Sequence, residues 1–301
     1  MRFLLKAALI LVACCAVFAP RGSSAADNWM RDYVENRVAE QISRSAGDEA
    51  ASQFLRWKTG RIVGGTIAPA SLWPQQVALL RAGASTSLNL QFCAGTLIHA
   101  RFVVTAAHCS DFVTAAQVRV LTGTKSLYTG GVRRMVKRIR VHPNWNPNTF
   151  ANDVAVWELT AAVPGITPAA MILPSQETAL TAAADDAWVT GWGTLYHGGP
   201  SSGFLRQAVV PMIARSVCNG PGSYRGAIFA SMVCAGKLDG SVDACQGDSG
   251  GPLWVRNASS QYIVAGITSW GNGCGIPNFP GVYTRLAVFS GWVRNVILSA
   301  N

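Results

Sequence analysis

Near its C-terminal end the chain contains Asp243-Ala244-Cys245-Gln246-Gly247-Asp248-Ser249-Gly250-Gly251-Pro252, its most informative stretch. This stretch places Ser249 in a glycine-rich turn, directly after Asp248 and six positions after Asp243. A serine hydroxyl is a weak nucleophile unless an exposed turn presents it to a neighbouring base. Glycines let backbone N–H groups approach a developing oxyanion. An ordinary glycine-rich surface loop has the same composition, so the rest of the chain must supply the base.

The beginning of the chain has the composition of an export signal. A basic start is followed by an apolar run over residues 7–19 and by small residues up to Ala26. This order is typical of a secretory signal peptide, and the apolar run is too short to span a bilayer. We therefore expect a signal peptide over residues 1–26 and a secreted protein, extracellular or periplasmic, with no stable membrane association. The alternative is a lipoprotein leader, because Leu11-Val12-Ala13-Cys14 resembles a bacterial lipid-attachment box.

The chain has 301 residues, of which 50% are hydrophobic and 13% charged, so a substantial core can form. Eight cysteines are present, and six remain outside the leader, namely Cys93, Cys109, Cys218, Cys234, Cys245 and Cys274. An even number in an exported chain predicts disulfides, and pairing neighbours along the sequence is the simplest arrangement. Zinc binding is the competing interpretation, but no C-x-x-C pair occurs. We expect neither a metal site nor a cofactor.

The formal net charge is +10, and its densest patch is the sequence Arg-Arg-Met-Val-Lys-Arg-Ile-Arg over residues 133–140. Val136 and Ile139 interrupt the cations, which predicts a half-exposed strand with a basic outer face. Such a face either stays solvated or binds an anionic partner. No nucleic-acid motif and no interleaved aromatic residues accompany it, so we do not expect nucleic-acid binding.

Residues 27–61 differ in texture from the rest of the chain. Apolar residues recur at every fourth position from Met30 to Ile42, with charges between them, which predicts an amphipathic helix. From Ile62 onward, short apolar runs separated by Gly, Pro and Asn predict an all-β barrel or sandwich. The clearest expected strands are 76–80, 102–106, 118–121, 154–159, 188–192, 262–267 and 282–285. Helical spacing of apolar residues from Leu286 to Ile297 predicts a C-terminal helix.

The order of the histidines restricts which base can serve Ser249. All four precede it, namely His99, His108, His142 and His197. The segment Gly247–Gly251 also fits the nucleophile elbow of α/β-hydrolases, but those enzymes place their histidine after the serine. The subtilisin order needs an aspartate before the histidine, and the aspartates before His108 all lie within residues 27–61. The order that remains is His, Asp, Ser.

His108 and Asp153 are the candidates for that order. His108 follows a predicted strand and stands beside the half-cystine Cys109, which fixes its backbone. Asp153 opens an apolar strand, where a partly buried carboxylate needs a partner such as a protonated imidazole. Each residue also has a purely structural interpretation, as a lone histidine and as a turn aspartate.

The wider sequence contains seven segments that come in one order over residues 62–301. They are Ile62-Val63-Gly64-Gly65, Thr105-Ala106-Ala107-His108-Cys109, Asn152-Asp153-Val154, Gly191-Trp192-Gly193, Gly247-Asp248-Ser249-Gly250-Gly251-Pro252, Ser269-Trp270-Gly271 and Pro280-Gly281-Val282-Tyr283. Together they resemble the chymotrypsin/trypsin family of serine endopeptidases. The resemblance implies an all-β protease domain over residues 62–301, made of two packed Greek-key six-stranded antiparallel β-barrels with a C-terminal α-helix.

The resemblance also implies a role for each catalytic residue. Ser249 would attack the scissile carbonyl, His108 would carry the proton, and Asp153 would hold the imidazole in place. The backbone N–H groups of Gly247 and Ser249 would form the oxyanion hole.

Specificity follows from the same resemblance, which assigns to substrate binding Asp243, Ala244, Ser269, Trp270, Gly271, Gly281 and Phe150. Asp243 would lie at the base of the primary pocket and select Arg or Lys before the cut bond. Ala244 stands where many trypsins carry serine, so a lysine ammonium loses an acceptor while arginine still pairs with both carboxylate oxygens. We expect Arg to be preferred over Lys.

Activation is implied by Arg61 and Ile62, which resemble the family's zymogen cleavage site. Cleavage after Arg61 would free the Ile62 amine to pair with Asp248, and residues 27–61 would be a partly helical propeptide. We expect a monomer that acts on protein or peptide substrates and meets proteinaceous inhibitors. The alternative is a catalytically inactive homologue that serves as a binding module.

Overall fold

The computed structural model describes residues 65–69, 71–83, 85–194 and 200–300. The expected signal peptide, the propeptide with its amphipathic helix, Arg61, Ile62 and His197 lie outside the described residues. The chain divides into two units, residues 1–59 and 60–301, and the fold below is that of the second. Within the described part of the chain, no helix is both long and apolar enough to cross a bilayer.

The first half of the described chain forms a closed β-barrel. Its strands are β2 (Gln76–Arg81), β3 (Gln91–His99), β4 (Phe102–Thr105), β5 (Val118–Thr122), β6 (Val132–Val141) and β7 (Ala155–Leu159). They close in the order β2-β3-β4-β7-β6-β5, with every neighbouring pair antiparallel. A closed barrel leaves no free sheet edge, so its backbone groups pair internally.

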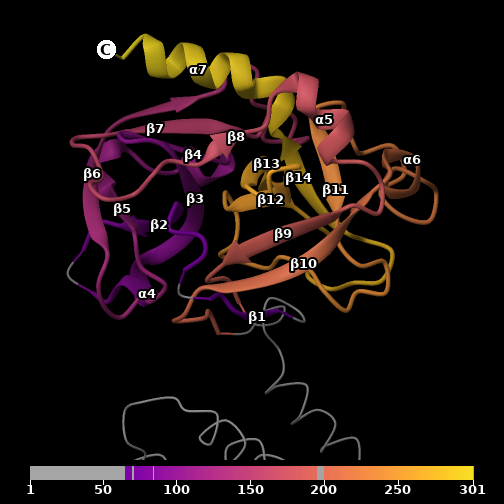
Figure 1. Ribbon diagram of the computed structural model, residues 1–301, viewed down its shortest axis with the longest axis horizontal. Helices are drawn as coiled ribbons and strands as arrows, with labels where there is room; N and C mark the ends of the chain where they lie inside the picture. The colour runs from indigo at the N-terminus through magenta and orange to yellow at the C-terminus, as the bar shows by residue number, and fades with distance from the viewer. Residues whose placement is uncertain (1–64, 70, 84, 195–199, 301) are drawn as a thin grey trace, which may run out of the picture. The chain divides into compact units, whose positions relative to one another are not determined.

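The second half forms another barrel, to the right of the first in Figure 1. Its strands are β9 (Asp186–Gly191), β10 (Arg206–Ile213), β11 (Met232–Ala235), β12 (Pro252–Arg256), β13 (Tyr262–Trp270) and β14 (Gly281–Arg285). The order is β10-β11-β14-β13-β12-β9, and pairing of β9 with β10 closes it. Two short strands extend this sheet, β1 (Thr66–Ile67) beside β10 and β8 (Ala170–Met171) beside β13. The expected pair of six-stranded barrels is confirmed.

Helices are short and lie outside the sheets. They are α4 (Ser87–Leu90), η1 (His108–Ser110), η2 (Ala115–Gln117), α5 (Pro174–Leu180), α6 (Arg215–Cys218), η3 (Leu286–Phe289) and α7 (Ser290–Leu298). The expected C-terminal helix is confirmed as α7, which directly follows the short 3-10 helix η3 and lies along the top of Figure 1.

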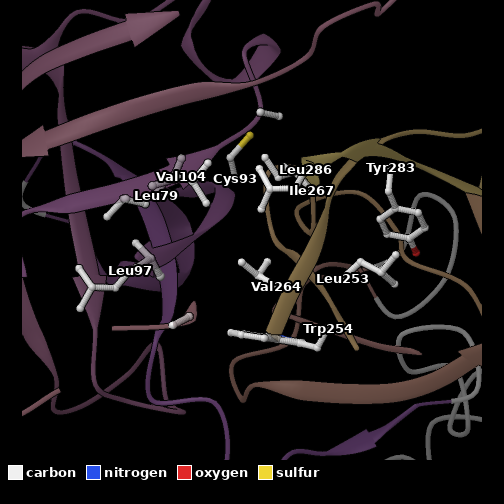
Figure 2. Packing of buried hydrophobic residues seen from close by; sticks show 14 of the residues in the cluster. Leu79, Cys93, Leu97, Val104, Leu253, Trp254, Val264, Ile267, Tyr283 and Leu286 are labelled. Carbon is white, nitrogen blue, oxygen red and sulfur yellow. The ribbon is translucent and has the colours of Figure 1, made fainter. Parts of the chain in front are cut away.

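One continuous apolar core runs through both barrels. Alternate residues of each strand face inward, as in β10, where buried and more exposed positions alternate. Figure 2 shows Leu79, Leu97 and Val104 of the first barrel on one side of the junction, and Val264, Ile267 and Trp254 of the second on the other. The junction is therefore packed, and segments held there keep fixed relative positions.

Three disulfides join Cys93 to Cys109, Cys218 to Cys234, and Cys245 to Cys274. Each links neighbours along the sequence. The first ties β3 to η1, and the third ties the loop before Ser249 to the loop after β13. A cross-link of this kind typically contributes about 2–4 kcal/mol.

Candidate active site

His108 and Asp153 meet because the strands next to them are paired. Thr105 at the end of β4 lies opposite Ala155 at the start of β7. His108 follows the first of these strands and Asp153 precedes the second, so both emerge at the same end of the pair. Asp153 Oδ2 lies 2.8 Å from His108 Nδ1, and Asp153 Oδ1 accepts a 2.9 Å hydrogen bond from the backbone N–H of His108.

The Asp153 carboxylate is buried and has further donors from the second barrel. Ser269 Oγ in β13 donates to Asp153 Oδ2 at 2.5 Å, and Thr284 Oγ1 in β14 donates to the Asp153 carbonyl at 2.6 Å. The side chain of Ser269, which the sequence had assigned to substrate binding, is thus hydrogen-bonded to Asp153. Because its oxygens are held from several directions, the carboxylate fixes the orientation of the His108 ring.

Ser249 is half-buried in a loop that both barrels hold. The backbone N–H of Ala94 in β3 donates to the Ser249 carbonyl at 2.7 Å, and Gly250 N donates to Thr268 O in β13 at 2.8 Å. The Cys93–Cys109 disulfide joins the same strand, β3, to the residue after His108. Ser249 and His108 are therefore both anchored to adjacent residues of one strand.

The glycines of this loop are required by its backbone. Gly247 and Gly250 have φ of 92° and 79°, in the left-handed region. A Cβ on Gly250 would lie 2.2 Å from Thr105 Oγ1 and 2.4 Å from Ala94 O. The loop reaches this close approach only without side chains at these positions.

Gln91 holds the loop from the side of the first barrel. Its Nε2 donates to the Gly247 carbonyl at 2.8 Å and to the Cys93 carbonyl at 3.1 Å. Gln91 is not among the site residues predicted from the sequence, because no pattern around it distinguishes it from other glutamines. The contact spans 156 positions of sequence and becomes visible only in the fold.

Asp248 points into a buried site beside the end of β9. Its oxygens accept hydrogen bonds from Gly193 N at 2.8 Å and Cys245 N at 3.0 Å. A Cβ on Gly191 would lie 1.9 Å from Asp248 Oδ1, which explains a glycine on each side of Trp192. Burial raises the pKa of Asp248 to about 6.

Asp243 is a second buried acid, close to Gly275 and Gly281. Its Oδ1 accepts from Ala244 N at 2.8 Å and its Oδ2 from Gly275 N at 3.0 Å. Burial raises the pKa of Asp243 to about 6. A Cβ on Gly281 would lie 3.0 Å from both Asp243 Oδ1 and the Tyr283 hydroxyl, so a side chain there would crowd both groups.

The family model described as Trypsin matches residues 62–293. The chain belongs to the trypsin family of serine proteases. It is 41% identical over 244 residues to serine protease 56 of Homo sapiens, covering 78% of this chain and 38% of that protein. It is 36% identical over 263 residues to transmembrane protease serine 7 of Mus musculus, covering 84% of this chain and 30% of that protein. It is 31% identical over 263 residues to transmembrane protease serine 11G of Mus musculus, covering 87% of this chain and 62% of that protein. The chain thus spans 30% to 62% of the length of these relatives.

In this trypsin-family chain, Tyr283 is a neighbour of Asp243 for which the sequence predicted no role. Its side chain is buried, and its hydroxyl has no hydrogen-bond partner among the residues that the structure describes. Burial and the charges of Asp243 and Asp248 hold the pKa of Tyr283 well above its usual value. The hydroxyl therefore stays neutral, and its oxygen can accept a hydrogen bond from a donor beside Asp243.

Aromatic side chains form a wall next to the His108 ring. The Phe150 ring lies 5.7 Å from the His108 ring and 6.5 Å from Trp270, and Trp270 lies 4.8 Å from Tyr224. The backbone of Phe150 has φ of 55°, an uncommon value for a bulky residue.

A Cβ on Gly271 would make only ordinary contacts, the nearest at 3.5 Å. A small side chain at position 271 would therefore fit without a clash, and packing alone does not require a glycine there.

One cluster of metal-ligating residue types occurs among the described residues, namely Cys93, His108 and Cys109. Both sulfur atoms belong to a disulfide, so neither is a thiolate that could bind zinc. His108 is left as a single ligand, which does not hold an ion.

Proposed function

We propose that this chain is a serine endopeptidase that cleaves peptide bonds after Arg, and less readily after Lys. The observation that supports it most is the 2.8 Å contact between His108 Nδ1 and the buried Asp153, beside a loop that presents Ser249. With Nδ1 occupied, His108 Nε2 is the nitrogen available to the serine hydroxyl.

The proposed reaction proceeds through two acyl transfers. Ser249 Oγ forms a bond to the scissile carbonyl carbon while its proton passes to His108 Nε2. His108 then gives this proton to the leaving amine as the C–N bond breaks, which leaves an acyl ester on Ser249. Water repeats the same steps and releases the acid. Asp153 stays ionised and stabilises the imidazolium that forms in each half.

The oxyanion of each tetrahedral intermediate needs fixed donors. We assign these to the backbone N–H groups of Gly247 and Ser249, in the loop held by Gln91 and Ala94. Removing one such donor in a related kind of site costs on the order of 3 kcal/mol of transition-state stabilisation. A loop fixed in advance contributes this energy without reorganisation during the reaction.

Asp243 supports the specificity for a basic residue. Its carboxylate is buried and accepts two backbone hydrogen bonds, from Ala244 and Gly275, but burial still disfavours its charge. A guanidinium or ammonium that enters beside Gly271 and Gly281 would offset that cost. The Ala244 methyl offers no acceptor to an ammonium, whereas a planar guanidinium can pair with both oxygens of Asp243, so Arg is favoured.

Asp248 supports activation by cleavage after Arg61. Hydrolysis of that bond would create an α-ammonium group on Ile62, whose pKa lies near 8 in an unperturbed chain. Asp248 is 2% exposed, and burial raises the pKa of its carboxyl, so a nearby cation would stabilise the ionised form of Asp248. We propose that the Ile62 ammonium occupies it and orders the adjacent Gly247–Ser249 loop.

The same proposal assigns residues 1–26 to an export signal, 27–61 to a propeptide and 62–301 to the protease domain of a secreted, monomeric protein. Protein substrates and proteinaceous inhibitors are the partners that this assignment implies. The cut after Arg61 has the specificity of the enzyme itself, so the chain can activate its own copies.

A phosphonate ester that carries a benzamidine group tests the proposal directly. We expect it to modify Ser249 in the Arg61-cleaved protein, as identified by mass spectrometry, and to leave an Asp243→Asn variant much less modified. A Ser249→Ala variant is the matched control and should take no label. If the cleaved protein takes no label at Ser249, it is an inactive homologue, and its function would be binding.

A further inference from the structure

The outer surface of the first barrel carries a row of cations that the proposed reaction does not use. Arg133, Lys137, Arg138 and Arg140 are exposed along β6, and Arg119 is half-buried in the neighbouring strand β5. We call these five residues, with Met135 in their midst, the cationic face. In Figure 1, β6 lies at the outer left edge of the molecule, on the side away from the second barrel.

A β-bulge concentrates the charge of this face. Val136 pairs with Leu159 and Arg138 with Glu158, so Lys137 is an extra residue between two consecutive pairs. An extra residue bends the strand and interrupts the in-and-out alternation. Lys137 and Arg138 are consequently both exposed, where a regular strand would turn one of them inward.

Among the residues that the structure describes, carboxylates neutralise only part of the face. Glu158 alone is close, 2.7 Å from Lys137 Nζ and 3.8 Å from Arg138 Nε. Within the described ranges, no carboxylate comes within ion-pair distance of Arg119, Arg133 or Arg140. Residues 65–171 contain nine Lys/Arg and three Asp/Glu, against seven and six in residues 172–300. Among the described residues, most of the excess positive charge therefore lies in the half of the chain that forms the first barrel.

The middle of the face is apolar. Met135 is 52% exposed and lies opposite Arg119, between the outward positions of Arg133 and Lys137. Outward residues of a strand stand about 7 Å apart, which is also the spacing of alternate side chains in an extended peptide. The thioether of a methionine packs adaptably against an apolar side chain, but it is too weak a hydrogen-bonding group to bind a sugar or a phosphate. The face carries no aromatic residue on which a base could stack.

We propose that the cationic face docks an extended acidic polypeptide segment, with Asp or Glu at alternate positions around one apolar residue. The carboxylates pair with the guanidinium groups, and the apolar residue lies against Met135. Arg140 lies opposite Val156 on β7, three positions after Asp153, so one end of the face lies near the end of the barrel that holds the candidate site. This proposal concerns binding alone and does not depend on the proposed function.

Fluorescence anisotropy with the full chain tests it. The probe is a labelled peptide of about twelve residues with Glu at alternate positions and a central Leu. We expect saturable binding that weakens when ionic strength rises from about 0.05 M to about 0.5 M, because exposed charges are screened. A peptide with Gln in place of Glu should not bind, and one with Ser in place of Leu should bind more weakly.

Two variants and a control assign the binding to the face. Arg119→Gln/Arg133→Gln/Arg140→Gln spares the Glu158 ion pairs and should weaken the acidic peptide about tenfold. Arg225→Gln/Arg256→Gln/Arg294→Gln removes the same charge from the second half of the chain and should bind like the wild type. Met135→Ser should abolish the difference between the Leu and Ser peptides.

Several results would overturn the proposal. One is equal loss of binding in both triple variants, and another is a Met135→Ser variant that still distinguishes the Leu and Ser peptides. A third is tighter binding, at equal ionic strength, of a sulfated octasaccharide or a single-stranded oligonucleotide than of the acidic peptide. The salt titration of the wild type needs no variant, so loss of binding by misfolding cannot imitate the expected result.

Discussion

Gln91 is the side chain through which the first barrel reaches the proposed oxyanion hole. Gln91→Glu keeps the shape of the side chain but replaces the Nε2 donor to the Gly247 carbonyl with an oxygen. A lost hydrogen bond of this kind is worth about 1–1.5 kcal/mol, so we expect kcat to fall about tenfold with KM nearly unchanged. Steady-state kinetics of the Arg61-cleaved protein on an Arg peptide measure both constants.

Gln75→Glu is the matched control, because Gln75 Nε2 also donates to a backbone carbonyl, that of Thr167, in an exposed position. It should leave kcat and KM unchanged. A rise in KM without a change in kcat for Gln91→Glu would place the residue in substrate binding and contradict its positioning role.

Asp243 gives the pocket a predictable dependence on pH. Its pKa is about 6 because the carboxyl is buried, so the group is neutral below that pH and ionised above it. A bound cation favours the ionised form, and binding of benzamidine should therefore weaken progressively as pH falls below about 6. Calorimetric titration between about pH 5 and pH 8 checks this, with Asp243→Asn expected to bind weakly at every pH. A flat profile for the wild type would remove Asp243 from the pocket.

At this scale, the site residues that the sequence predicts are those that stand in motifs. Ser249, His108 and Asp243 could be assigned because glycines, a half-cystine or a fixed spacing mark their surroundings. Gln91 contacts the Gly247 carbonyl far away along the chain, and its neighbours in sequence give no sign of it. Tyr283 stands in one of the seven family segments, but its place beside Asp243 becomes visible only in the fold. Such partners depend on how the two barrels pack, which local patterns do not encode.

At the scale of elements, the end of β9 is shaped by the carboxylate beside it. Gly191→Ala would place a Cβ 1.9 Å from Asp248 Oδ1, a contact that only a shift of the strand or of the nucleophile loop can relieve. We expect a loss of at least about 1–3 kcal/mol of unfolding free energy, as overpacking of a core typically costs. Urea unfolding of the full chain measures it.

Gly291→Ala in α7 provides the comparison, since no atom lies within 4 Å of the added Cβ. Alanine favours a helix by up to about 1 kcal/mol over glycine, so this variant should be neutral or more stable. Equal stability of Gly191→Ala and the wild type would show that the nucleophile loop is not fixed against β9.

Strands could be predicted where the pattern of side chains was regular or strongly apolar. The basic run over 133–140 forms part of β6, as expected, and the strand expected at 118–121 is β5, within one residue. The strand β3 was not among the clearest expectations, because its central residues are buried on both faces and no alternation marks them. The bulge at Lys137 depends on the pairing of β6 with β7, which only the fold defines.

At the scale of the whole molecule, the two buried acids link stability to pH. Both Asp243 and Asp248 have a pKa of about 6 in the folded chain, above the usual aspartate value of 3.8, because both carboxyls are buried. The folded state therefore binds more protons than the unfolded state between these values, and this contribution to stability is lost as pH rises through about 6. Asp248→Asn should remove its share of that loss.

The test compares the uncleaved wild type with uncleaved Asp248→Asn by urea unfolding at several values between about pH 4 and pH 7. As pH rises, the unfolding free energy of the wild type should fall relative to that of the variant. Cleavage after Arg61 should reduce this difference by supplying a cation for Asp248. A difference that stays constant with pH would mean that ionisation of the buried Asp248 does not destabilise the folded chain. The proposed pairing of Asp248 with the Ile62 ammonium would then bring no gain in stability.

The architecture of two barrels and a C-terminal helix was expected from seven segments in family order, and the structure has it. What the sequence could not provide is the junction, where Asp153 receives donors from β13 and β14 and Ser249 is held by β3. The proposed active site is a property of the packed pair of barrels, because neither one supplies all of its parts.

The cleavage-site profile of the Arg61-cleaved protein on a diverse peptide library tests the central proposal most directly. Mass spectrometry of the products should show cuts after Arg, fewer after Lys, and none with Ser249→Ala. Cuts after apolar or acidic residues, or equal cutting by the Ser249→Ala variant, would contradict the roles proposed for Asp243 and Ser249.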